Sequence, residues 1–405
     1  MLFVGIDWAE HHHDVCVMGP EGLVYAKRRV TDSVAGIGEL HALVAEHDDQ
    51  EDESVVVGIE IDRGLLVGSL VAAGYQVFAI NPLSVARYRD RHATSGAKSD
   101  RGDAKVLADL VRTDRQNHRP VAGDSELVEG VKLLARAHQN AIWSRQRQIN
   151  ALRSSLREYY LAALVAFGTD LSSSDALAIL AIAPTPELGR GLSRSKIASA
   201  LRRGGRQRNV ETRAEEIQAS LRSDQLEAPA RIARAHGTIT RSAVILIGAF
   251  NAEITELEAA LSEHFEQHPD AKVVLSLPGL GTVLGARVLG EFGDDRTRFS
   301  GPKSRKNYAG TSPITRASGQ SRVVLARFAR NRRLADACDQ WAFCTLQISP
   351  GARSYYDELR TRGKTHHQAL RALANRLVGI LHICLERRVL YSETMAWPSQ
   401  TELAA

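Results

Sequence analysis

Four acidic residues near the start of the chain have the type and spacing to bind divalent metal. Asp7 follows the apolar segment Phe-Val-Gly-Ile, and Glu60 follows Val-Val-Gly-Ile. Asp100 and Asp103 are three residues apart, so they share one helix face if Asp100 begins a helix. Clustered carboxylates at an apolar sheet edge persist only when they are paired or bind metal, and their oxygens suit Mg²⁺ or Mn²⁺. Two such ions could clamp the attacking and leaving oxygens of a phosphodiester.

Each of these acids also has an ordinary structural explanation. Asp100 can be a helix N-cap, and Asp7 and Glu60 can be strand-end acids that pair with arginines. Asp14 and Asp62 are close enough in sequence to be mistaken for ligands. The three consecutive histidines before Asp14 are not expected to bind one ion, because adjacent residues of a strand point in different directions.

A basic block in the last third could hold the phosphate chemistry. Residues 296–333 contain eleven Lys and Arg and no Asp or Glu, a pattern that attracts polyanions. The alternative is a solvated basic face. Together with two glycines upstream, the block supplies the expected nucleic-acid-binding residues: Gly279, Gly281, Lys303, Arg305, Lys306, Arg316, Arg322, Arg327 and Arg330.

Ser318 is the candidate nucleophile inside this block. It precedes a glycine, which permits close backbone approach, and it has Arg316 and Arg322 nearby. A serine hydroxyl is a poor nucleophile until a base, a metal or a cationic environment activates it. By itself a Ser-Gly pair usually marks a turn. The rival nucleophiles in the same block are Ser312, Ser321 and Tyr308.

The two glycines belong to Leu277-Pro278-Gly279-Leu280-Gly281, which precedes a predicted helix over 282–291. A helix, a glycine turn and a second helix N-terminus form a helix-hairpin-helix-like motif, which offers backbone N–H groups to a DNA phosphate. A plain helix C-cap and turn would have the same pattern.

The acids require a folded sheet to bring them together, and the first 120 residues predict one. Three closely spaced strands predict an antiparallel meander, and the apolar strands that alternate with helices predict a sheet covered on both faces. This order is the one found in ribonuclease-H-like nucleases. The strands are predicted at 2–7, 14–18, 23–30, 54–60 and 75–80, and the helices at 33–45, 64–73, 82–91 and 101–112.

The middle of the chain is predicted to be helical. Residues 126–160 and 242–264 have apolar residues at helical spacing, which predicts two long amphipathic helices. They bracket an insertion at about 161–240, and they could form an antiparallel or intermolecular coiled coil, or an intramolecular helical bundle. A mainly α-helical region follows over 269–390, and residues 391–405 form a tail.

Composition excludes several classes of protein. The chain has 405 residues, a net charge of +5, and apolar and charged fractions of 44% and 24%, which are typical of globular proteins. No apolar run approaches a membrane span of ~20 residues, and the N-terminus does not resemble a signal peptide. The four scattered cysteines contain no C-x-x-C pair, so we expect a reduced, cytoplasmic protein without a disulfide framework or zinc knuckle.

Taken in order, the motifs resemble those of the insertion-sequence transposases called the "IS one-ten" family, relatives of the Piv DNA invertase. The resemblance covers nearly the whole chain, and the combination is far more specific than any one motif. One departure is Ile61-Asp62-Arg63-Gly64, where Ala-Thr-Gly is commoner. The motifs are Gly5-Ile6-Asp7, Gly58-Ile59-Glu60, Lys98-Ser99-Asp100-Arg101-Gly102-Asp103-Ala104, Leu277-Pro278-Gly279-Leu280-Gly281, Tyr308-Ala309-Gly310 and Arg316-Ala317-Ser318-Gly319.

The resemblance implies a RuvC-like domain over 1–120, a helical coiled-coil region over 121–268 and a transposase domain over 269–390. It implies that Asp7, Glu60, Asp100 and Asp103 form a metal-binding Asp-Glu-Asp-Asp tetrad and that Ser318 is a catalytic serine. It also implies recombination of donor and target DNA, guided by a structured non-coding bridge RNA that the element encodes. Two duplexes must be held together, so we expect a homo-oligomer, a dimer or a tetramer.

Two other functions remain open on the residues. A RuvC-type junction nuclease would cut with metal-activated water and would not need Ser318. A catalytically silent nucleic-acid-binding scaffold is the non-enzymatic alternative, although clustered acids near DNA bring a scaffold no benefit.

Overall fold

The structure, a computed structural model, describes residues 1–47, 54–92, 100–121, 123–318 and 321–398. It divides into two compact units, Met1–Gly123 and Asp124–Ala405. The side chains of His92, Asp100, Arg101 and Arg119 lie outside the described part as well. Among the described residues, no helix is both long and apolar enough to cross a membrane.

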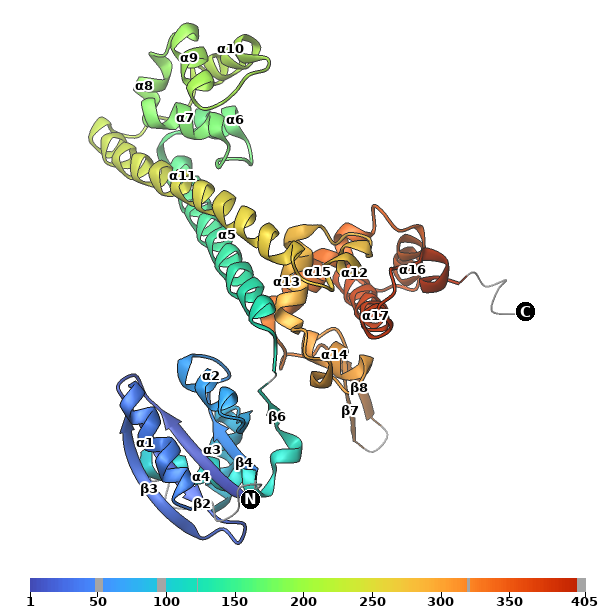
Figure 1. Cartoon of the computed structure of the whole chain (residues 1–405). Helices are drawn as coiled ribbons and strands as arrows, with labels where there is room; N and C mark the ends of the chain where they lie inside the picture. The colour runs from blue at the N-terminus through green and yellow to red at the C-terminus, as the bar shows by residue number, and fades with distance from the viewer. Residues whose placement is uncertain (48–53, 93–99, 122, 319–320, 399–405) are drawn as a thin grey trace. The chain divides into compact units, whose positions relative to one another are not determined.

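The first unit is built on a six-stranded sheet with the order β3-β2-β1-β4-β5-β6 (Figure 1). β1, β2 and β3 form the antiparallel meander that the sequence predicts, whereas β4 and β5 add parallel to β1, and β6 closes the far edge antiparallel. The strands are β1 (Leu2–Trp8), β2 (His12–Met18), β3 (Val24–Thr31), β4 (Val55–Ile59), β5 (Gln76–Ala79) and β6 (Arg119–Pro120).

Helices cover both faces of this sheet, as predicted. One face packs on α1 (Val34–Ala45) and α2 (Leu65–Ala72) through a core that includes Val4 and Ile6. The other face packs on α3 (Pro82–His92) and α4 (Asp100–Thr113) through Phe3 and its neighbours. Two-sided burial explains why the strands are almost continuously apolar in the sequence.

Two glycines let α4 lie directly on the sheet. A Cβ atom on Gly5 of β1 would overlap the backbone carbonyl of Ala104, and one on Gly58 of β4 would lie 2.7 Å from the carbonyl oxygen of Leu107. Because backbone atoms cannot move aside as a flexible side chain can, any larger residue at Gly5 would push α4 away from the two strands that end in Asp7 and Glu60.

We expect Gly5→Ala to destabilise the protein by about 3 kcal/mol or more, at the upper end for overpacked cores, because the added methyl group meets backbone. Gly38→Ala is the matched control: Gly38 lies in the interior of α1 with open space around its Cα, so alanine there should stabilise by about 0.5–1 kcal/mol. Urea unfolding of the variants measures both effects. Equal unfolding free energies for Gly5→Ala and the wild type would contradict the close approach of α4.

The second unit begins with two long helices that lie side by side, α5 (Glu126–Tyr159) and α11 (Ala230–Glu266) (Figure 1). Both predicted helices are confirmed, although α11 begins twelve residues before the predicted start at 242. Its extra turns pack against the inserted segment, where Gly237 meets Pro184 and Thr185. The two helices pair within one chain, which is the antiparallel intramolecular arrangement among those the sequence left open.

The insertion folds into a small helical subdomain with its own core at the end of this helical pair (Figure 1). Tyr159 anchors it, because its hydroxyl donates to the carbonyl of Pro184 and contacts Thr240 Oγ1 in the buried interior. Its helices are α6 (Leu161–Phe167), α7 (Ser174–Ile182), α8 (Pro186–Arg190), α9 (Arg194–Arg203) and α10 (Val210–Leu221).

The C-terminal part is mainly α-helical, as predicted, but it also contains a two-stranded hairpin that the sequence analysis did not predict. Its core centres on Trp341 and the apolar face of α17. The elements are α12 (Ala271–Ser276), α13 (Thr282–Phe292), α14 (Pro302–Ala309), β7 (Ile314–Ser318), β8 (Ser321–Leu325), α15 (Arg332–Thr345), α16 (Pro350–Thr361), α17 (His366–Arg387) and α18 (Glu393–Ala396).

Candidate functional site

Asp7 and Glu60 lie side by side at the carboxyl ends of two parallel strands. Ile6 of β1 is paired with Ile59 of β4, so the next residue of each chain segment is one of the two acids. Phe3 and Gly5 face α4, and alternation along a strand places Asp7 on that same face. The strand register therefore brings together two of the four acids that the sequence singled out.

The N-terminal end of α4 lies at the same edge of the sheet. Arg115, which follows α4, donates to Met1 Sδ and lies 5.7 Å from the Phe3 ring, so α4 runs antiparallel to β1. Asp103 therefore lies toward the Asp7 end; it is 6% exposed and forms an ion pair with Arg89 of α3. Asp100 is the first residue of α4, and its side chain lies outside the described part.

A fifth acid, Asp14, lies directly opposite Asp7 in the antiparallel β1–β2 pair. It is only 3% exposed and accepts two hydrogen bonds from Arg29 of β3, with Arg29 Nη2 2.6 Å from Oδ2. Two like charges directly opposite each other repel. Arg29 offsets that repulsion, so Asp14 has the ordinary structural explanation that the sequence left open.

The donor chemistry of this edge fits a hard divalent cation. The acids offer only oxygen donors and lie where neighbouring strands and α4 converge. Among the described side chains, no group of three or more His, Cys, Asp or Glu is close enough to hold a metal ion. A complete set would need the Asp100 side chain and the Asp103 carboxylate, which Arg89 binds here. His13, the buried one of the three consecutive histidines, instead contacts Asp32 Oδ1 through Nε2 at 3.3 Å.

Ser318 is the last residue of β7, at the tip of an exposed hairpin. Its cross-strand partner is Ser321, the first residue of β8. Every residue of β8 and all but the first of β7 are exposed, so the hydroxyl group of Ser318 can meet a large substrate without rearrangement of the core. Because paired Cβ atoms lie about 5 Å apart, Ser321 remains the nearest rival nucleophile.

The hairpin register separates the two arginines that flank Ser318 in sequence. Arg316 is two residues from Ser318 on β7, so both share one face, about 7 Å apart. Arg322 is paired with Ala317 and lies on the opposite face. The structure thus gives the serine one arginine on its own face rather than two.

The segment before β7 and the segment after β8 contact each other at the base of the hairpin. The backbone N–H of Asn331 donates to the carbonyl of Tyr308 at 3.1 Å, and Arg327 Nε donates to the carbonyl of Ser312 at 3.4 Å. The aliphatic part of Arg330 lies on Gly310, whose φ of 73° favours glycine. These contacts fix where β7 begins and where β8 ends.

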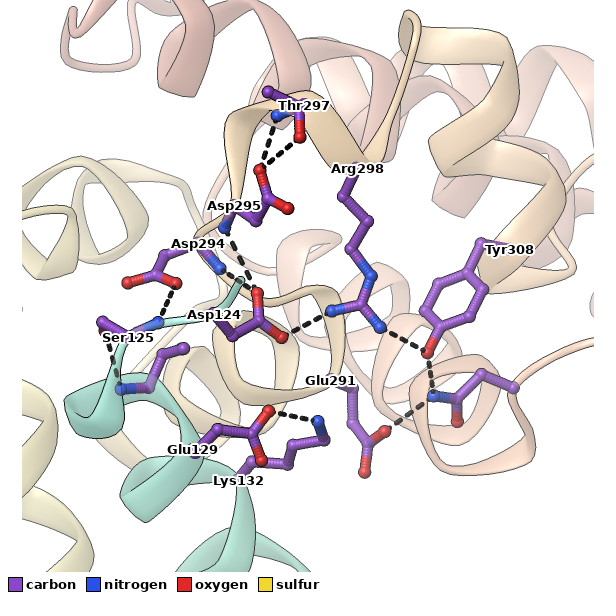
Figure 2. Close-up of polar contacts among 12 residues, drawn as sticks. Asp124, Ser125, Glu129, Lys132, Glu291, Asp294, Asp295, Thr297, Arg298 and Tyr308 are labelled. Atoms are coloured by element: carbon purple, nitrogen blue, oxygen red, sulfur yellow. Dashed lines mark hydrogen bonds and ion pairs between the residues drawn. The ribbon is translucent and has the colours of Figure 1, made fainter. Parts of the chain in front are cut away.

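Tyr308 belongs to a part-buried polar network that includes Arg298 and Glu291 (Figure 2). Asn331 Nδ2 donates to Glu291 Oε2 at 2.6 Å and to the Tyr308 hydroxyl oxygen at 3.1 Å. Arg298 Nη2 reaches the same hydroxyl at 3.5 Å, while its Nη1 donates to Asp124 at 2.7 Å. Tyr308 also packs on Phe299 with ring centres 5.6 Å apart. This half-buried, hydrogen-bonded phenol is a structural group, which weakens it as a rival nucleophile.

Glu291 is the buried acid of that network, and the sequence analysis did not single it out. Burial raises its pKa, but hydrogen bonds from Arg136 and Asn331 outweigh burial, so the pKa lies below the ordinary value. Arg136 of α5 forms two bonds, at 2.7 and 2.9 Å. Glu291 thereby ties α5 and α13 to the start of α15; its position as the second-last residue of an apolar helix is the signal in the sequence.

One predicted nucleic-acid-binding residue is not on the surface. Arg305 is 7% exposed and lies over the rings of Phe292 and Phe299, at 4.9 and 4.7 Å. Burial, and then the positive charge of Arg298, lower its pKa to about 10. The prediction that Arg305 contacts a DNA backbone is therefore corrected: it is a core cation that stacks on aromatic rings.

The remaining predicted contacts differ in their surroundings. Gly279, with φ of 82°, is packed against the backbone of Thr345, whereas Gly281 at the start of α13 faces open space. The helix, turn and helix of the predicted motif are present, but the turn is braced from one side by Trp341, which donates to the carbonyl of Pro278 at 2.9 Å. The other predicted cations are exposed or half-buried: Lys303, Lys306, Arg316, Arg322, Arg327 and Arg330.

Two models of transposase families match separate parts of the chain. A model for the DEDD domain of IS110 elements, described as "Transposase", matches residues 4–161. A second model, described as "Transposase IS116/IS110/IS902 family", matches residues 271–357. Between them they cover the sheet with its acids and the helical region with the serine hairpin.

Several relatives match this chain over nearly its whole length. The chain is 45% identical to the "Mini-circle putative transposase for IS117" of Streptomyces coelicolor, over 100% of this chain and 98% of the relative. It is 28% identical to the "Insertion element IS900 uncharacterized 42 kDa protein" of Mycobacterium paratuberculosis, over 100% of this chain and 99% of the relative. The chain therefore belongs to the IS110/IS116/IS902 family of insertion-sequence transposases, the "IS one-ten" family, whose members are enzymes that act on DNA.

Proposed function

We propose that this transposase cuts and rejoins DNA through a covalent phosphoserine link at Ser318. The observation that carries the proposal is the hairpin, which places a serine hydroxyl at an exposed tip with Arg316 on the same face. Attack would form the Oγ–P bond while a P–O bond to deoxyribose breaks. The serine proton leaves and the released oxygen takes one up, so the number of phosphodiester bonds is conserved and strands can be exchanged without an external energy source.

We further propose that the first unit is a RuvC-like domain and that Asp7, Glu60, Asp100 and Asp103 hold Mg²⁺ there. Sheet order and the adjacent positions of Asp7 and Glu60 support this. When bound, the metal would supply positive charge that stabilises the attacking and leaving oxygens. The carboxylates of this chain would fix the position of the ions, and Arg89, which now binds Asp103, would have to release it.

A structured non-coding RNA encoded by the element is the proposed guide. Base pairing between this RNA and the DNA would then supply sequence specificity, while the exposed cations of the hairpin region would bind the phosphate backbone. We also propose that the protein acts as a dimer or tetramer, since recombination needs two duplexes held together. Light scattering of the nucleic-acid-bound protein should show more than one chain, and a monomer in that state would remove the oligomer from the proposal.

A two-plasmid reaction tests the function. Purified protein is mixed with Mg²⁺, a plasmid that carries the element ends, a target plasmid and a transcript of the non-coding DNA beside the gene. Recombination predicts joined donor–target molecules only when the transcript is present. A metal-dependent junction nuclease predicts cut ends without joined products, and a silent scaffold predicts bound but intact DNA, so each alternative gives a different product.

Arg316 and Arg322 form a matched pair for testing the register of the hairpin. We expect Arg316→Ala to lower the rate of strand cleavage by about 10²-fold, because the charge that develops on the phosphate loses a donor on the serine face. Arg322→Ala should lower it by less than about tenfold, since this arginine lies on the opposite face and contributes mainly to overall attraction. Single-turnover cleavage of labelled element-end DNA gives both rates. Equal losses, or a larger loss for Arg322→Ala, would contradict the assignment of faces.

A further inference from the structure

A cavity of about 640 Å³ lies at the base of the serine hairpin, inside the second unit. Its wall includes Gly310 and Thr311, which precede β7, and Phe328 and Arg330, which follow β8. The volume falls within the range of ordinary small-ligand sites, about 300–1,000 Å³. Ser318 is not among the residues that line the cavity, so the cavity is separate from the proposed nucleophile.

The charge of the cavity suits a phosphate. Arg330, Arg332 and Arg371 line it, and within the described part of the chain Arg332 and Arg371 have no acidic partner. The acid Asp336 is already neutralised, because Arg287 Nη2 lies 2.6 Å from its Oδ2. Asp339 is the one other acid on the wall, so cations outnumber the acids left to balance them.

Aromatic rings at the cavity suit a nucleobase. Phe328 is 84% exposed, an unusual place for a phenylalanine, and stands where a flat apolar ligand could stack on it. Trp143 of α5 also lines the cavity, and Arg333 lies 5.2 Å from its ring and holds it in position. An exposed ring next to unpaired arginines is the combination that binds single-stranded nucleic acid, because each base offers a free face only when it is unpaired.

We propose that this cavity holds an unpaired nucleotide of the DNA strand that is cut, with its base on Phe328 and its phosphate against Arg332 and Arg371. The inference rests on the proposed chemistry at Ser318, because that chemistry is what brings a DNA strand to the hairpin. Each strand of the hairpin has five residues, about 16 Å, so the bound nucleotide would lie in the same DNA strand as the phosphodiester that Ser318 attacks, separated from it by about the length of the hairpin.

Fluorescence anisotropy with the full-length protein, without Mg²⁺, tests the site. The probes are a labelled 12-residue oligothymidylate, a blunt DNA duplex of the same length and a 12-residue oligouridylate. We expect Phe328→Ala to weaken oligothymidylate binding about tenfold and duplex binding less than twofold. We expect Arg371→Ala to lower the salt dependence of oligothymidylate binding by about 0.7 in log–log slope, the effect of one lost phosphate contact.

Matched controls come from the same unit. Phe343→Ala removes an exposed phenylalanine of α15, and Arg360→Ala removes an exposed arginine of α16. Neither residue lines the cavity, so both variants should bind the three probes with unchanged affinity. Phe328 is too exposed for its loss to unfold the protein, which a thermal melt checks. The proposal is overturned if Phe328→Ala leaves the affinity for oligothymidylate unchanged or lowers the affinity for the duplex to the same extent. It is also overturned if Phe343→Ala has the same effect, or if Phe328→Ala weakens the binding of oligouridylate alone. Because no bond is cut, this result is independent of whether Ser318 forms an adduct.

Discussion

Ser318→Ala is expected to abolish both strand cleavage and the covalent protein–DNA product. Removal of a nucleophile costs on the order of 10⁴-fold or more in rate, because the remaining groups can bind the phosphate but cannot form the bond. The hydroxyl lies at the exposed tip of the hairpin, so alanine there should leave the fold and the affinity for DNA unchanged. The measurement is a reaction with labelled element-end DNA in Mg²⁺, stopped in denaturant and resolved by electrophoresis, with the adduct mapped by peptide mass.

Ser321→Ala is the control that the structure supplies. Ser321 is paired with Ser318 and lies on the same face of the hairpin, so the two residues have nearly the same surroundings. The Ser321→Ala variant is nevertheless expected to form the adduct, because Ser318 is intact. Tyr308→Phe is a second control, since the Tyr308 hydroxyl is bound by Asn331 and Arg298. An adduct that maps to Ser321 or Tyr308, or full cleavage by Ser318→Ala, would refute the assignment and favour the hydrolytic nuclease or a different nucleophile.

Asp103→Asn is expected to lower cleavage at least about hundredfold, because asparagine keeps the shape but removes a negative charge from the proposed metal ligands. The amide oxygen can still accept a hydrogen bond from Arg89, so the first unit should remain folded. A second readout is binding: Mg²⁺ should raise the melting temperature of the wild-type protein and raise it less in the variant, since only a ligand that binds the native state stabilises it.

Asp109→Asn is the matched control on the same helix. Asp109 pairs with Arg112 and accepts a hydrogen bond from Tyr88, one to two turns away from the sheet edge that holds Asp7. It should retain cleavage and the Mg²⁺-induced rise in melting temperature. Wild-type cleavage by Asp103→Asn, or an equal loss in both variants, would remove Asp103 from the site.

Most helices and strands, and the family, can be predicted from the sequence. Closely spaced strands with short turns predict the sheet meander, and helical spacing of apolar residues predicts the two long helices, because both patterns are local properties of the chain. The order of the short motifs identified the transposase family, which the full-length relatives confirm. The hairpin is harder to predict, because Ser318-Gly319 also fits a loop, although Gly319-Gln320 between two β-prone segments is a hairpin signal.

Which side chains share a surface depends on how distant segments pack together. Register between strands distant in sequence put Asp7 beside Glu60, and the cross-strand pairing of the hairpin put Arg316 but not Arg322 on the face of Ser318. Arg305, a predicted phosphate contact, is instead buried in the core. These outcomes depend on which distant elements pack together, and a pattern of residue types within one segment carries no record of the partner against which that segment packs.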